Sequence, residues 1–213
     1  GTDRKAPEGG VMKGYYFITD SNLSLAGIVS DTRKAVEAGA QVVQYREKSA
    51  ETGILYGEAL ALKEICAGRA TLIINDRIDI ALAVDADGTH IGQGDMPYEA
   101  ARRLLGPGKI IGVTVHNLEE AIEAARLGAD YLGVSPIFAT GTKQDAGTPC
   151  GIDMLRDIRR AVSLPLVAIG GIDLSNVEAV IDAGADMVCA ISAVVAKSDV
   201  AAEVLRFQRK FKL

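Results

Sequence analysis

The feature that most constrains the fold is a repeated junction, at which a helix-like segment ends in glycine and a short apolar run follows at once. The triplets Ala38-Gly39-Ala40, Leu127-Gly128-Ala129 and Ala183-Gly184-Ala185 each precede a hydrophobic run. Glycine just after a helix supplies a left-handed C-terminal cap, because it has no Cβ to disfavour a positive φ. The repeated junction therefore predicts a chain assembled from successive helix-to-strand units.

Short apolar runs alternate with amphipathic stretches from Tyr15 onward. Several runs are unbroken, such as LII and PLVAI, which is typical of strands buried on both faces of a parallel sheet. The stretches between them favour helices, for example Asn117–Leu127 with Asn117 as N-cap, and a closing helix is expected near Val200–Phe211. Strands are expected at Tyr15–Thr19, Gln41–Arg46, Thr71–Asn75, Gly88–Ile91, Lys109–Thr114, Tyr131–Val134, Pro165–Ile169 and Met187–Ile191.

Eight strands, each joined to the next by one short helix, indicate an α/β fold, a single-domain (β/α)8 TIM barrel. An open doubly wound sheet is the alternative, but so many short units within 213 residues favour closure. The barrel is expected to occupy residues 14–213. Residues 1–13 are polar and contain Gly9-Gly10, so they are interpreted as a flexible leader or an expression remnant.

The composition excludes several classes of partner. With a net charge of −5 and a pI of about 5.1, the chain lacks the basic face that nucleic-acid binding requires, so no nucleic-acid partner is expected. No apolar run approaches the roughly 20 residues that span a bilayer, and no membrane partner is expected. Cys66, Cys150 and Cys189 are odd in number and far apart, which argues against a disulfide framework and for a cytoplasmic protein. A homo-oligomer is left open.

Three cations are expected at one rim of the barrel, where the carboxyl ends of the strands carry the active site in this fold. Arg46 and Lys48 follow the second expected strand, and Lys143 lies in the loop after the sixth. A single lysine at a strand end is more simply interpreted as surface solvation. Three cations on two loops favour an anion pocket, in which a guanidinium binds phosphate through two parallel hydrogen bonds.

Two carboxylates, Asp76 and Asp95, follow the adjacent third and fourth expected strands. Taken singly, each is explained as the N-cap of a helix. Mg²⁺, however, typically takes one or two carboxylates together with phosphate oxygens of the substrate. Beside three cations, the pair therefore predicts a metal site that serves a polyphosphate.

A second anion site is expected at the ends of the last two strands, where Gly170-Gly171 and Ile191-Ser192 lie. Barrels often bind a phosphate there through backbone N–H groups, although glycines in a tight turn are an alternative. The long loop 135–151 contains Thr140, Gly141 and Thr142 and is a candidate lid that carries Lys143.

Six short segments resemble those of thiamine-phosphate synthase, in the same order and over nearly the whole chain from Tyr15. They are VQYREK at 43–48, INDR at 74–77, THIGQGD at 89–95, GTK at 141–143, AIGG at 168–171 and Ile191-Ser192. The resemblance implies that a hydroxymethylpyrimidine diphosphate is coupled to the nitrogen of a thiazole phosphate, which forms thiamine phosphate and releases pyrophosphate. It also implies Mg²⁺ as the cofactor and two small-molecule substrates.

Carried over by these motifs, the resemblance implies roles for individual residues. Asp76 and Asp95 would ligate Mg²⁺. The catalytic residues that stabilise the departing pyrophosphate would be Arg46, Lys48 and Lys143. The thiazole phosphate would be held by Thr140, Gly141, Thr142, Gly171, Ile191 and Ser192. The pyrimidine diphosphate would be held by Gln44, Tyr45, Arg46, Glu47, Lys48, Asn75, Thr114 and Lys143.

The implied reaction needs no strong protein nucleophile, because the electron-rich aminopyrimidine delocalises the positive charge as pyrophosphate leaves. No Ser-His-Asp or Cys-His pattern is apparent in the sequence. His90 is interpreted as a core histidine with satisfied hydrogen bonds, and Cys189 as a core residue. Thr114 stands where many relatives have serine, and it keeps the hydroxyl.

Two other functions stay open. The thiazole tautomerases share the barrel, the REK and INDR segments and a histidine like His116. Against that reading stand Asp95 and the intact TGTK at 140–143, because a tautomerase has no pyrophosphate to bind. A non-catalytic barrel that senses a phosphate ligand is the third hypothesis, and it predicts binding without release of pyrophosphate.

Overall fold

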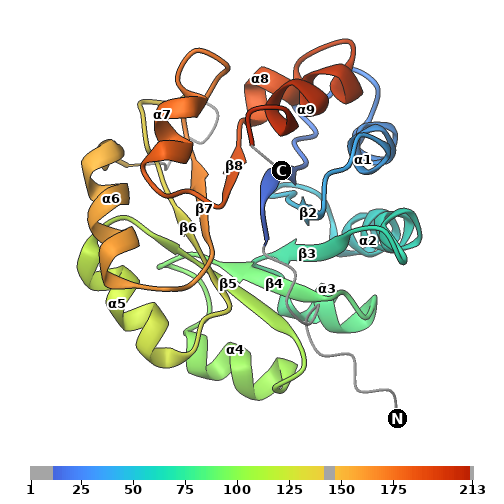
Figure 1. The fold of residues 1–213 in the computed structure, drawn as a ribbon. Coiled ribbons are helices and arrows are strands. Elements are labelled where there is room, and N and C mark those ends of the chain that lie inside the picture. Colours follow the sequence, from blue (N-terminus) through green and yellow to red (C-terminus); the bar gives the residue numbers. More distant parts are fainter. Residues whose placement is uncertain (1–11, 142–146, 212–213) are drawn as a thin grey trace.

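Eight parallel strands, each paired with the next and the last with the first, close into a barrel in a computed structural model that describes residues 12–141 and 147–211 (Figure 1). Closure joins β1 to β8, where Gly14 pairs with Met187 and Tyr15 with Val188. The predicted TIM barrel is therefore confirmed. The strands are β1 (Gly14–Ile18), β2 (Val42–Tyr45), β3 (Thr71–Asn75), β4 (Gly88–Ile91), β5 (Ile110–Val115), β6 (Tyr131–Val134), β7 (Leu166–Ile169) and β8 (Met187–Cys189).

The helices surround the strands and pack on the outside of the barrel (Figure 1). The predicted N-cap of α5 is confirmed, because the Asn117 side chain accepts a 2.9 Å hydrogen bond from the backbone N–H of Glu120. The helices are α1 (Ile28–Glu37), α2 (Thr52–Cys66), α3 (Ile78–Ala83), α4 (Tyr98–Leu105), α5 (Leu118–Leu127), α6 (Gly151–Ala161), α7 (Val177–Asp182), α8 (Ile191–Val195) and α9 (Val200–Gln208).

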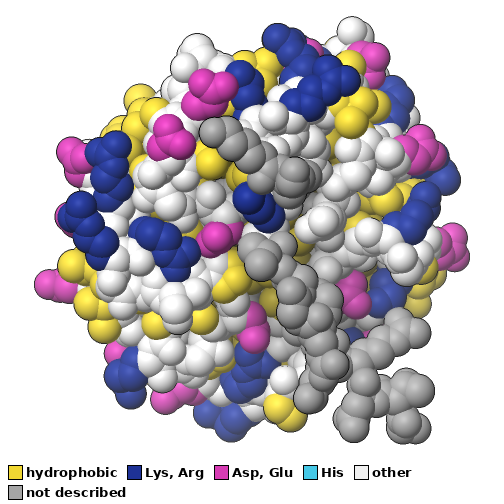
Figure 2. Space-filling model, in the orientation of Figure 1, with side chains coloured by type: hydrophobic (Ala, Val, Ile, Leu, Met, Phe, Trp, Pro, Cys, Tyr) yellow, Lys and Arg dark blue, Asp and Glu magenta, His cyan; other side chains and the backbone are white. Residues whose placement is uncertain are grey.

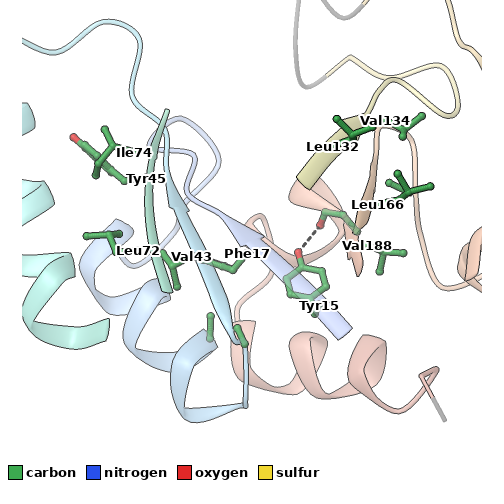
Figure 3. Packing of buried hydrophobic residues seen from close by; sticks show 14 of the residues in the cluster. Tyr15, Phe17, Val43, Tyr45, Leu72, Ile74, Leu132, Val134, Leu166 and Val188 are labelled. Atoms are coloured by element: carbon green, nitrogen blue, oxygen red, sulfur yellow. Dashed lines mark hydrogen bonds between the residues drawn. The ribbon is translucent and has the colours of Figure 1, made fainter. Parts of the chain in front are cut away.

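The predicted end of the last strand is wrong. β8 stops at Cys189, and Ile191 begins the short helix α8 instead of ending a strand. The carbonyl of Ala190 accepts a hydrogen bond of 3.1 Å from the Tyr15 hydroxyl, the bond drawn in Figure 3. The backbone leaves the parallel ladder at this point because its carbonyl is bonded to a side chain of β1.

The glycines of the repeated junction adopt the left-handed backbone that the sequence predicts. The angle φ is 91° at Gly39, 94° at Gly128 and 109° at Gly184. At each position the chain leaves a helix, turns, and enters the next strand within a few residues.

A second repeat lies at the opposite ends of the strands from the predicted site. An aspartate directly before β4, β6 and β8 accepts the backbone N–H of the strand that precedes it in the barrel, at 2.7 to 2.8 Å. Each aspartate also forms an ion pair with a basic residue of a helix. The three sets are Asp87 with Leu72 and Lys63, Asp130 with Ile111 and Arg102, and Asp186 with Leu166 and Arg159.

Successive side chains of each strand alternate between two apolar layers. Phe17, Val43 and Leu72 face the helices in one row, because the register pairs Phe17 with Val43 and Val43 with Leu72 (Figure 3). Met12 packs against the inner layer, while residues 1–11 of the expected leader lie outside the described residues. The inner layer is Tyr16, Ile18, Val42, Ile73, Tyr131, Val167, Met187 and Cys189.

The outer surface carries acidic and basic side chains interspersed on the face shown in Figure 2. Across the ranges that the structure describes, no helix combines the length and apolar character needed to cross a membrane. Cys66, Cys150 and Cys189 are all free.

Candidate active site

A pocket opens at the carboxyl ends of the strands, where the sequence places the site. Its empty volume is about 730 Å³ including the open mouth, which suits a small metabolite. The predicted residues among those that line it are Gln44, Arg46, Asn75, Thr114, Thr140, Gly171, Ile191 and Ser192.

Arg46 stands at the pocket wall on a backbone that the buried Thr19 holds in place. The Thr19 hydroxyl accepts the backbone N–H of Arg46 at 2.9 Å and donates to its carbonyl at 3.3 Å. Within the described part of the chain, the Arg46 guanidinium has no hydrogen-bond or ion-pair partner. An unpaired guanidinium on a pocket wall is suited to bind an anion.

Lys48, Asp76 and Asp95 form a charged cluster beside the pocket. Arg46 and Asn75, which are close to them in the sequence, line the pocket wall. The Lys48 ammonium pairs with Asp76 Oδ2. Burial, followed by the neighbouring Asp95, raises the pKa of Asp76, and Lys48 acts in the opposite direction. The two carboxylates therefore repel each other, and this repulsion favours a further positive charge at the cluster.

The N-cap interpretation of the two aspartates is not supported. Arg77 precedes the first turn of α3 and Pro97 that of α4, and neither helix start has a side-chain cap. Asp76 has a left-handed φ of 59°, and Asp95 Oδ2 accepts the backbone N–H of Gly92 at 2.7 Å. Two adjacent carboxylates are a donor set that fits Mg²⁺ when ligand oxygens complete its shell, and among the described residues no larger acidic or histidine cluster competes with them.

Tyr45 and Glu47 point away from the pocket. Gln44 faces the barrel interior, so the next side chain, Tyr45, faces α2, where its hydroxyl donates to Glu58 at 2.5 Å. The Glu47 carboxylate accepts hydrogen bonds from Ser21 and from Ser49, so it joins the loops after β1 and β2. These bonds outweigh the effect of partial burial and lower the pKa of Glu47 to about 2. Both residues shape the loop that carries Arg46 and Lys48.

Gly171 lines the pocket, but a different contact explains why it is glycine. The sequence predicts a close approach of the backbone to phosphate at this position. In the structure φ is 63°, and a Cβ at Gly171 would lie 2.6 Å from the carbonyl oxygen of Ala139 and 2.7 Å from Phe138 Cβ. The loop after β6 therefore packs directly on this glycine.

The remaining predicted site residues either do not line the pocket or lie outside the described residues. Gly141 is exposed and is not among the lining residues, while Thr142 and Lys143 lie outside the described residues. His116 is half-exposed at the start of α5, where its Nδ1 lies 3.0 Å from Glu120 Oε2. It is also absent from the pocket lining.

The sequence analysis missed a chain of hydrogen bonds beneath the pocket. His90 is a buried histidine with both ring nitrogens bonded, as predicted, yet it also lines the pocket. Its Nδ1 lies 2.9 Å from the Tyr131 hydroxyl, and that hydroxyl lies 2.7 Å from the hydroxyl of Tyr16. The sequence signal that points to this chain of hydrogen bonds is the alternation of side chains along a strand, which places Tyr16 on the same face as Ile18.

Comparison with known proteins gives a consistent result. The family described as thiamine monophosphate synthase matches residues 15–194. A thiamine-phosphate synthase of Methanosarcina mazei is 55% identical over 193 residues, which are 91% of this chain and 80% of that protein. A thiamine-phosphate synthase of Chloroflexus aurantiacus is 54% identical over 88% of this chain and 87% of that protein. A thiamine phosphate pyrophosphorylase structure from Pyrococcus furiosus has a TM-score of 0.87 at 39% identity, with 94% of this chain and 96% of that chain covered.

Proposed function

The chain belongs to the thiamine monophosphate synthase family, and from that premise we propose how its residues couple hydroxymethylpyrimidine diphosphate to a thiazole phosphate. It is a transferase of thiamine biosynthesis that forms thiamine phosphate and pyrophosphate. The observation that carries the residue roles is Arg46 on the pocket wall, which has no ion-pair partner among the described residues and lies beside the cluster of Lys48, Asp76 and Asp95. A cation beside an acidic pair is an arrangement that suits a metal-bound diphosphate.

The pyrimidine diphosphate lies along the β2, β3 and β5 side of the pocket in this proposal. Gln44, Asn75 and Thr114 line that side and hold the ring, and Arg46 binds the diphosphate. Lys48 approaches the diphosphate from Asp76, and Lys143 would join it from the loop after β6. Tyr45 and Glu47 contribute through the loop that they support and not by direct contact of their side chains.

Asp76 and Asp95 would hold Mg²⁺ in this proposal. When bound there, the ion neutralises the charge of the diphosphate and makes pyrophosphate a better leaving group. Lys48 pairs with Asp76, and it would be free to bind phosphate oxygens if that carboxylate held the ion instead.

The thiazole phosphate is assigned to the ends of β7 and β8. Gly171, Ile191 and Ser192 line the pocket there, and Thr140 faces them from the loop after β6. Gly141 and Thr142 complete the proposed set. Backbone N–H groups suit a monophosphate, because they bind it without the charge density that a diphosphate needs.

The pocket positions the substrates and carries no activated nucleophile among its described residues. Burial raises the pKa of Cys189, so its thiol stays protonated. Both nitrogens of His90 are bonded to hydroxyl groups of the protein. Catalysis then rests on alignment of the thiazole nitrogen with the pyrimidine carbon, and on stabilisation of the departing pyrophosphate by Arg46, Lys48 and Lys143.

The test is to mix the protein with both substrates and Mg²⁺ and to assay thiamine phosphate. Lys143→Ala should reduce kcat about a hundredfold, because a contact that strengthens in the transition state acts on rate. A tautomerase would instead lose its activity in His116→Ala and be unimpaired in Lys143→Ala. A sensor would bind both ligands and release no pyrophosphate. We also propose the cytoplasm as the compartment, supported by the three free cysteines.

A further inference from the structure

Five side chains form a continuous chain of hydrogen bonds across the inside of the barrel. Gln44 Nε2 donates to the Tyr16 hydroxyl at 2.8 Å, and the hydroxyls of Tyr16 and Tyr131 are 2.7 Å apart. His90 Nδ1 lies 2.9 Å from the Tyr131 hydroxyl, and His90 Nε2 lies 2.8 Å from Thr114 Oγ1. The two ends of the chain, Gln44 on β2 and Thr114 on β5, are the residues assigned above to the pyrimidine.

The barrel makes room for this chain with glycines. A Cβ at Gly112 would lie 2.0 Å from Tyr131 Cζ, and one at Gly133 would lie 3.0 Å from His90 Cε1. Tyr16 and Tyr131 are 0% and 1% exposed, and their ring centroids are 5.9 Å apart. Packing therefore holds both rings in place. Their hydroxyl groups bond to each other, to Gln44 and to His90.

The direction of each bond follows from the number of protons. A tyrosine has one hydroxyl proton, and an imidazole that accepts a hydrogen bond on one ring nitrogen is neutral and has its single N–H on the other. Gln44 donates to Tyr16, and neither tyrosine hydroxyl has another acceptor among the described residues, so the Tyr16 proton goes to Tyr131 and the Tyr131 proton goes to His90 Nδ1. His90 therefore carries its proton on Nε2 and donates it to Thr114.

This direction fixes what the two ends offer to a ligand. Thr114 accepts from His90, so its own hydroxyl proton is left to donate into the pocket. Gln44 donates one Nε2–H to Tyr16, and its carbonyl Oε1 takes no part in the hydrogen-bond chain and can accept from a ligand. A reversed chain would offer the opposite pair, a donor at Gln44 and an acceptor at Thr114, and every bond between them would have to reverse with it.

We propose that Tyr16, Tyr131 and His90 are positioning residues, which fix Gln44 as an acceptor and Thr114 as a donor toward the aminopyrimidine ring. The inference rests on the proposed function, because it assumes that this ring lies in the pocket. An aminopyrimidine offers an N–H donor next to a ring nitrogen acceptor, which is the complement of this pair. The chain thus selects the ring by polarity, while the charged groups bind the diphosphate.

The first test is the proton position on His90 in the ligand-free protein. The protein contains two histidines, so ¹⁵N NMR resolves the signals of both, and a His116→Gln variant assigns them. The expected result is a protonated Nε2 and an unprotonated Nδ1. A proton on Nδ1 would mean that the chain runs the other way and would overturn the proposal, whatever reaction the enzyme performs.

The second test removes one hydroxyl and keeps the ring. Tyr131→Phe should raise the KM for the pyrimidine diphosphate about tenfold, and leave the KM for the thiazole phosphate within about twofold, because one buried bond no longer orders the chain. By calorimetry, the parent should prefer the pyrimidine diphosphate over its analogue without the amino group, and Tyr131→Phe should lose most of that preference. Tyr98→Phe is the matched control, since its hydroxyl bonds Gly128 and Arg102 on the outside of the barrel.

The outcomes separate the positioning role from a structural one and from failure of the proposed function. If Tyr131→Phe only lowers Tm, with both KM values and the amino-group preference unchanged, the positioning role is refuted. If the parent makes no thiamine phosphate, the proposed function fails, yet the NMR result still decides the direction of the chain.

Discussion

Tyr131 occupies the space that any side chain at Gly112 would fill, because a Cβ built at Gly112 would lie 2.0 Å from Tyr131 Cζ. The two residues face each other in register on neighbouring strands β5 and β6. The glycine therefore allows a buried phenol in the middle of the barrel, where its hydroxyl reaches both Tyr16 and His90.

Gly112→Ala should consequently destabilise the barrel. The added methyl group must displace a fully packed ring, and overpacking of this kind costs about 1–3 kcal/mol. Urea unfolding of the variant measures the loss. Gly53→Ala on the surface of α2 is the control, since nothing lies within 4 Å of a Cβ there and alanine favours a helix. Equal stability of Gly112→Ala and the parent would contradict the packing argument.

The Thr19 clamp predicts an effect on anion binding from a residue that does not line the pocket. Thr19→Val keeps the shape of the side chain but removes both hydrogen bonds to the Arg46 backbone. The Kd for pyrophosphate in the presence of Mg²⁺ should rise about tenfold, because Arg46 is no longer held at the wall. Thr19→Ser keeps the hydroxyl and should bind as the parent does by calorimetry. Identical Kd values for Thr19→Val and the parent would show that the clamp does not position Arg46.

Much of the architecture is predictable from local pattern, but the ends of the elements are not. The junction glycines and apolar runs specify a barrel, since each feature depends on a few neighbouring residues. Where β8 ends depends on Tyr15, which lies at the other end of the chain and takes the Ala190 carbonyl. No local pattern carries that information.

The charged part of the site is predictable for a different reason. Arg46, Asp76 and Asp95 follow strand ends, and all strand ends of a parallel barrel meet at one rim. Which side chains face inward depends on the stagger of the strands, so sequence reasoning assigned Tyr45 to the ligand although it faces α2. It missed Tyr131, whose partners come from β1 and β4.

The repeated aspartate before the even strands predicts a stability effect far from the pocket. Asp130→Ala leaves the backbone N–H of the buried Ile111 without its acceptor and Arg102 without its ion pair. The free energy of unfolding should fall by about 2 kcal/mol. Asp153→Ala removes a carboxylate whose pair with Arg156 is on the surface, and it should change stability by less than about 0.5 kcal/mol. The Asp130 bonds are unimportant if urea midpoints of both variants coincide.

Glu47 predicts how stability depends on pH. Its pKa in the folded protein is about 2, below the ordinary value of 4.5, so the folded state favours the ionised form. The resulting stabilisation is fully present above pH 4.5 and is lost as the pH falls toward 2. After allowance for solvent screening, Glu47→Gln should lower the stability at pH 7 by about 1 kcal/mol and match the parent at the acid end. Glu37→Gln, an exposed carboxylate on α1, should show no such pH-dependent difference in thermal melts.

The contact between Asp76 and Asp95 predicts the metal requirement. Burial and the Asp95 charge raise the pKa of Asp76, and a divalent cation between the carboxylates would remove that repulsion. Asp95→Asn should therefore raise the Mg²⁺ concentration for half-maximal activity at least about tenfold, because one of two anionic ligands is lost. Electron paramagnetic resonance can follow the binding of Mn²⁺ in the presence of pyrophosphate, a measurement that needs no turnover, and this binding should weaken in parallel.

Asp79→Asn is the control. This carboxylate is three residues from Asp76 and is paired with Arg77 on the surface of α3, so its variant should titrate as the parent does. If Asp95→Asn and Asp76→Asn both follow the parental Mg²⁺ and Mn²⁺ curves, the metal lies elsewhere, and the Lys48 pair with Asp76 only braces the loop after β2.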